Sequence, residues 1–111
     1  MSVYESATNL ANDIKESKEY NNFKDAMQEL KQDKDNEDLL KNYKFIKAQM
    51  ESCKNVDRNL YLRSKGLYES IQRKAMKNKK VYKYIEAEQK FTTMMNNINN
   101  ILAEAVENDY K

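Results

Sequence analysis

The chain has 111 residues, the length of a single domain, and 34% of them are charged although the net charge is only +2. It has no His and one Cys, which excludes Ser-His and Cys-His catalysis, an internal disulfide and a Cys/His zinc site. A glycine-rich phosphate loop is excluded as well, because there is only one Gly. The absence of Pro and the abundance of helix-forming residues predict an all-α fold.

The first two predicted helices cover residues 3–16 and 18–32. Ser17 is the expected break between them, because its hydroxyl can accept a hydrogen bond from the next helical turn. The break is either a bend or a loop, since no Gly or Pro forces a turn. The apolar side chains of these helices recur at helical spacing: Val3, Ala7, Leu10, Ala11 and Ile14, then Tyr20, Phe23, Met27 and Leu30.

The middle of the chain is expected to form helices at residues 37–55 and 59–77, with Asp35 or Asn36 as the first N-cap. The spacing of Leu39, Tyr43 and Ile46 is that of an amphipathic helix. Residues 54–59 are the most polar run, so a kink or short loop is expected there. One continuous helix over 37–77 is the alternative that the pattern leaves open.

The last predicted helix, residues 79–107, has the strongest pattern in the sequence, with Asn78 as its expected N-cap. Its seam follows heptad spacing and consists of Val81, Tyr84, Glu88, Phe91, Met95, Ile98, Leu102 and Ala105. A helix with such a seam needs a partner. We expect one helical domain over residues 1–111. It would be an elongated antiparallel hairpin or bundle of long helices, with residues 37–77 paired to the last helix and the shorter N-terminal helices packed across them.

The charges are unevenly distributed along the chain. Residues 39–85 carry 13 basic and 3 acidic side chains, whereas the segments on either side are acidic. Acidic helices packed on basic ones, within one chain or across a dimer, would explain this distribution. A basic surface for an anionic partner such as RNA is the alternative. The candidate anion or RNA contacts are Arg73, Lys74, Lys77, Lys79, Lys80 and Lys83.

Exposed seams predict a homodimer or a higher homo-oligomer. Glu88 is the one charged residue on the seam; it either reaches water or a basic neighbour, or fixes helix register and oligomer identity. The candidate interface residues are Tyr20, Phe23, Tyr84, Ala87, Glu88, Phe91, Met95 and Ile98. No catalytic, cofactor-binding or metal-binding residues, no small-molecule substrate and no enzymatic activity are predicted. The lack of a signal peptide and of about 18 consecutive apolar residues predicts a cytoplasmic protein without membrane contact.

Two blocks of sequence resemble the YlbF/YmcA/YheA family of small helical bacterial proteins. The first is Ile14-x-x-Ser17-x-Glu19-Tyr20, followed by Phe23 and Lys24. The second is Asn78-x-x-Val81-x-x-Tyr84-x-x-Ala87-Glu88-x-x-Phe91. The first block also includes the stripe of Tyr4, Ala7 and Leu10 and the later positions Leu30 and Asp33, and the second is followed by Ile98, Asn99, Ile101 and Val106. Together the blocks cover nearly the whole chain, and the region from about 53 to 66 matches poorly. The chain length is closest to that of the YheA-like branch.

The resemblance implies an all-α, self-associating protein without catalytic activity that acts as a regulator or adaptor. Members of the YlbF and YmcA branches act with protein partners in competence, sporulation, biofilm formation and RNA processing. Some members are associated with an iron–sulfur cluster. That property is not carried over, because Cys53 is the only thiol here and such clusters use four.

Overall fold

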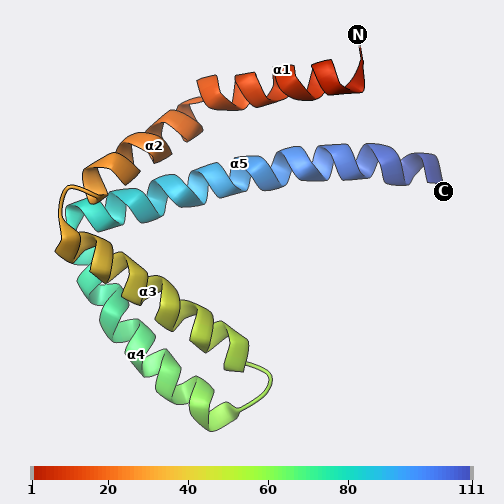
Figure 1. Ribbon diagram of the computed structural model, residues 1–111. Helices are drawn as coiled ribbons and strands as arrows, with labels where there is room; N and C mark the ends of the chain where they lie inside the picture. Colours follow the sequence, from red (N-terminus) through yellow and green to blue (C-terminus); the bar gives the residue numbers. More distant parts are fainter. Residues whose placement is uncertain (1, 111) are drawn as a thin grey trace. The chain divides into compact units, whose positions relative to one another are not determined.

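The computed structural model describes residues 2–110, which form helices joined by short connections and contain no strand (Figure 1). The all-α prediction is therefore confirmed. The helices are α1 (Val3–Glu16), α2 (Lys18–Leu30), α3 (Lys34–Cys53), α4 (Arg58–Lys77) and α5 (Lys79–Tyr110).

A single residue separates α1 from α2. Ser17 has extended backbone angles, φ −68° and ψ 152°. Its Oγ donates to the carbonyl of Ile14 at 2.6 Å and accepts from the backbone N–H of Tyr20 at 3.1 Å. One hydroxyl thus satisfies the end of one helix and the start of the next, so that no Gly or Pro is needed.

The connection between α2 and α3 ends at Asp33, which is the N-cap of α3. Its carboxylate accepts from the backbone N–H of Asp35 at 2.9 Å, and its backbone is extended. Helix α3 therefore begins three residues before the predicted start, and Asp35 lies in its first turn, where the helix dipole favours a negative charge.

The segment for which one or two helices were left open forms two. Helix α3 ends at Cys53, and α4 begins after Asp57, whose carboxylate accepts from the backbone N–H of Leu60 at 3.1 Å. The two helices pack as an antiparallel hairpin (Figure 1). The tight hairpin therefore forms within the middle segment, whereas the sequence placed it between that segment and the last helix.

Asn78 alone separates α4 from the 32-residue helix α5. Its Oδ1 accepts from the backbone N–H groups of Lys80 and Val81, both at 3.1 Å. Its Nδ2 donates to Oδ1 of Asn36 at 2.6 Å, which ties this junction to the first turn of α3.

The described residues form two compact units. Unit 1 contains the chain up to Ala26 and the part of α5 from Ile85 on; unit 2 contains residues 27–84. In unit 2, the buried side chains are Leu30, Leu40, Tyr43, Cys53, Ser64, Ala75, Val81 and Tyr84. In unit 1, only Ala26 and Ala87 are buried among the described residues. Unit 2 thus has a small core of its own, and unit 1 has almost none.

Candidate protein-interaction surfaces

Three aromatic residues of the predicted interface meet inside unit 1. The ring of Phe91, on α5, lies 5.3 Å from the ring of Phe23 and 5.9 Å from that of Tyr20, both on α2. The Phe23 and Phe91 rings are close to parallel, at 18°. These contacts join α2 to α5 and bury part of each ring within the chain.

The other predicted interface residues lie along α5. Tyr84, in unit 2, and Ala87, in unit 1, are each 8% exposed. The ammonium of Lys44 lies 5.2 Å from the centre of the Tyr84 ring, which is a cation–π contact. Glu88, Met95 and Ile98 are half-buried. Contact of these residues with a partner chain stays a prediction.

The exposed large apolar side chains of unit 1 lie near the ends of the chain. Helix α1 has no buried residue, and every residue of α5 from 99 to 109 is exposed. The heptad seam therefore continues past Ile98 without cover. The large apolar side chains exposed here, which we call the open ends, are Val3, Tyr4, Ile101, Leu102 and Val106.

The interface residues predicted from the sequence lie at the centre of the seam and do not include the open ends. For Ile101 and Leu102, the distribution of charge is one signal. Residues 91–103 contain no charged side chain, although a third of the chain is charged. Depletion of charge is typical of the buried centre of a protein–protein interface.

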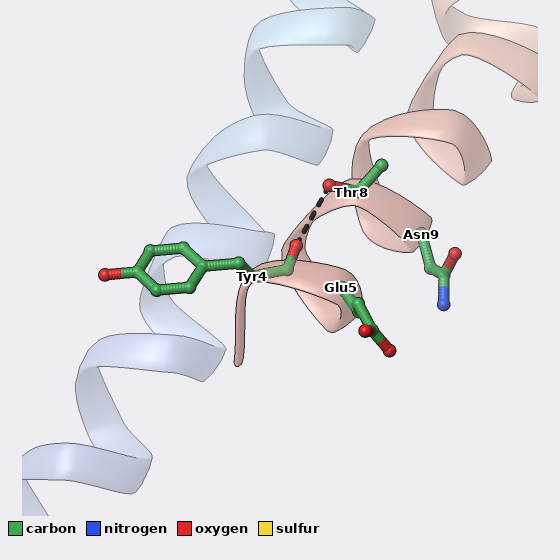
Figure 2. Close-up of a pocket in the computed structure, with 4 residues that line it drawn as sticks. All are labelled: Tyr4, Glu5, Thr8 and Asn9. Atoms are coloured by element: carbon green, nitrogen blue, oxygen red, sulfur yellow. Dashed lines mark hydrogen bonds between the residues drawn. The ribbon is translucent and has the colours of Figure 1, made fainter. Parts of the chain in front are cut away.

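A shallow hollow lies on the surface of α1, between Tyr4, Glu5, Thr8 and Asn9 (Figure 2). Thr8 Oγ1 donates to the backbone carbonyl of Tyr4 at 2.9 Å. Figure 2 shows the Tyr4 ring extending away from the side chains of Glu5 and Asn9. A hollow lined by one helix encloses little of a ligand. It is therefore better suited to contact with a partner protein than to binding a small molecule.

Inside the hairpin, the hydroxyls of Tyr43 and Tyr68 are 3.4 Å apart, and their ring centres are 5.7 Å apart. Burial of Tyr43 raises its pKa above the ordinary value of 10.0, and the hydrogen bond with Tyr68 raises it further. Tyr43 therefore stays neutral at physiological pH, and the position of the pair inside the hairpin, between α3 and α4, points to a structural role.

The basic stretch is exposed but has acidic neighbours. Both carboxylate oxygens of Glu29 bind the ammonium of Lys83, at 3.1 and 3.2 Å. The Asn36–Asn78 hydrogen bond brings the first turn of α3, with Asp35 and its acidic neighbours, beside the stretch. All six predicted anion contacts lie on the surface of unit 2: Arg73, Lys74, Lys77, Lys79, Lys80 and Lys83.

Neither a metal site nor a membrane span is found in the part of the chain that the structure describes. Residues 2–110 contain no cluster of three His, Cys, Asp or Glu side chains placed to hold an ion. No helix among them combines the length and apolar character needed to cross a bilayer.

The chain resembles known proteins over nearly its full length. Residues 3–107 match the family model described as "Control of competence regulator ComK, YlbF/YmcA". A UPF0342 protein of Desulfitobacterium hafniense is 26% identical over 106 residues, which is 96% of this chain and 86% of the relative. The crystal structure of Bacillus subtilis RicA in complex with RicF matches with a TM-score of 0.62 at 21% identity, over 98% of this chain and 96% of that one, so the fold is shared. The chain therefore belongs to the YlbF/YmcA family, as the two sequence blocks predicted.

Proposed function

We propose that this protein is a non-enzymatic regulator or adaptor that acts through helix-mediated contacts with other protein chains, including copies of itself. The observation that carries the proposal is the lack of a core in unit 1, where only Ala26 and Ala87 are buried among the described residues. Apolar helices with so little cover gain free energy when a partner chain removes them from water.

The family relationship supports the same proposal. The family description concerns control of the competence regulator ComK, and the matching RicA structure was solved as a complex with RicF. From this family relationship we infer that the regulated process is competence, sporulation, biofilm formation or RNA processing. The partners that fit are helical proteins of the YlbF/YmcA kind.

The open ends give the most direct test. A glutamate at Leu102 places a charge on the uncovered seam, whereas a glutamate at Asn100, on the same helix, lies outside the seam. Both positions are exposed, so neither change disturbs a core. We expect the purified protein to exceed its chain mass of 13.2 kDa in light scattering, and L102E to fall toward that mass while N100E does not.

Glu88→Ala tests the seam carboxylate in the same assay. If Glu88 fixes helix register between chains, its removal changes the oligomer mass or the melting temperature. A wild-type protein that is monomeric at high concentration and forms no complex with a YlbF- or YmcA-type partner would refute the proposal. Equal masses for L102E and N100E would show that the open ends do not take part in self-association.

A further inference from the structure

The outer face of α4 is basic and partly apolar. The stripe of α4 that contains the buried residues Ser64 and Ala75 packs on α3, so the opposite side of the helix points to solvent. Leu62 is 51% exposed on this side, and Leu67 is 56% exposed at its edge. Helix α4 carries six basic side chains and one acidic one, Glu69; Arg63, Arg73 and Glu69 lie on this face.

Gly66 lies at the centre of this face. A Cβ built on it would have no atom within 4 Å, so nothing in the chain requires a glycine at this position. A glycine inside a helix lets another backbone approach closely. We call Leu62, Arg63, Gly66, Leu67 and Arg73 the α4 outer face.

The last turns of α5 have the complementary character. Residues 99–110 contain three acidic side chains and no basic one. Leu102 and Val106 are 54% and 59% exposed and continue the seam, with Glu104 and Glu107 beside them. We call this segment the acidic end.

We propose that the acidic end of α5 docks on the α4 outer face of a second copy of this chain. The proposal rests on the self-association in the proposed function and names the two surfaces that carry it. Both surfaces combine apolar side chains with charge, and the charges are opposite, which favours this pairing over contact between two acidic ends. The apolar side chains favour a helical partner over a purely anionic polymer.

In the proposed dimer, the two copies exchange their ends reciprocally. Each copy offers one acidic end and one α4 outer face, so an exchange about a two-fold axis would make two identical contacts and a closed dimer. The opposite net charges of the units fit this exchange. Unit 1 has 10 acidic and 5 basic residues, and unit 2 has 15 basic and 8 acidic ones.

Charge reversal of each surface, followed by mixing, tests the exchange. The variant R63E/R73E makes the α4 outer face acidic, and E104K/E107K makes the end of α5 basic. In a dimer of either variant alone, both contacts bring like charges together. In a mixed pair, one contact joins a native end to a native face and the other joins a reversed end to a reversed face, so both are complementary.

We expect each variant alone to dimerise at least about tenfold more weakly in sedimentation equilibrium at about 0.05 M salt, and the mixture to recover a dimer. Wild-type dimerisation should weaken at about 0.5 M salt. The control is K41E/K47E, which reverses two exposed cations on α3 and should leave the dimer intact. Circular dichroism confirms that all three variants fold.

Loss of dimer in both variants without recovery on mixing would overturn the exchange. So would a dimer that is indifferent to either reversal, since another surface would then hold the copies together. These results leave the proposed function standing. A wild-type chain that stays monomeric overturns the inference, and it overturns the proposed function only if no complex with a family partner forms.

Discussion

The Tyr43–Tyr68 pair connects pH to the stability of the hairpin. Tyr43 is 5% exposed and lies 3.4 Å from the other hydroxyl. Burial, the Tyr68 hydrogen bond and the nearby Glu51 carboxylate all raise the Tyr43 pKa above its ordinary 10.0. The folded protein therefore keeps this phenol neutral at a pH at which the unfolded chain ionises it.

The sign of the pH effect follows from that shift. The contribution of Tyr43 to stability is complete below pH 10 and is lost as the pH rises above 10, because the unfolded state then releases a proton that the folded state retains. At one pH unit above the unfolded pKa, the loss amounts to about 1.4 kcal/mol.

Tyr43→Phe isolates this effect. At pH 8 we expect the variant to lose about 1 kcal/mol, the value of one hydrogen bond. At pH 11 the difference from wild type should vanish or reverse, since Phe does not ionise and the other seven tyrosines are common to both proteins. Urea unfolding at both pH values measures the difference, and an equal difference at both would contradict the raised pKa.

At the scale of the helices, single polar residues decide where each helix ends. Asn78 caps α5 with its side-chain oxygen and binds Asn36 with its side-chain amide. Helices α4 and α5 would otherwise be free to continue into each other, because no Gly or Pro lies near the junction. This one side chain therefore stabilises both the cap and the connection to α3.

Replacement of Asn78 separates the two roles. Asn78→Ala removes the cap and the Asn36 bond, and we expect a loss of about 1–2 kcal/mol of unfolding free energy. Asn78→Asp keeps the acceptor oxygen of the cap and adds a negative charge at the α5 N-terminus but loses the amide donor to Asn36, so it should lose less stability than Asn78→Ala. Urea midpoints compare the variants, and equal losses would mean that the cap does not contribute.

Local features of the helices could be predicted from the sequence, and non-local ones could not. The breaks at Ser17 and Asn78 depend on side chains that bond to their own neighbours, so the sequence located both. The predicted start of α3 is three residues late because Asp33, like the expected caps Asp35 and Asn36, has a side chain that can cap a helix. Which two helices form the hairpin depends on which apolar seams pack against each other, and the spacing of apolar residues does not contain that information.

The candidate site follows the same division. The heptad pattern correctly indicated a seam on α5, but the sequence could not tell that Phe91 finds its partners in Tyr20 and Phe23 within the chain. The sequence also could not show that the seam becomes exposed after Ile98, because exposure depends on where neighbouring helices lie. The uncharged run at residues 91–103 is visible in the sequence, and such a run is typical of the centre of an interface.

Across the whole molecule, charge is separated between the units while the total stays close to neutral. Unit 2 has a net charge of +7, and unit 1 has one of −5. A basic surface of this size attracts anions at low salt whether or not it recognises them. Binding to RNA at low salt alone therefore does not distinguish a specific contact from this general attraction.

We expect RNA binding to be weak and to disappear near physiological salt. Glu29 already binds Lys83, and the acidic first turn of α3 lies beside the basic stretch, so few of its cations can neutralise phosphates without competition. Fewer phosphate contacts mean a lower affinity, which falls with salt. A mobility-shift assay with a single-stranded RNA at about 0.05 M and about 0.15 M salt measures this.

The matched control is Glu29→Gln, which releases Lys83 and should strengthen binding at low salt. A wild-type shift that persists at the higher salt and is lost in K79E/K80E would contradict this expectation and favour an RNA-binding role for the stretch.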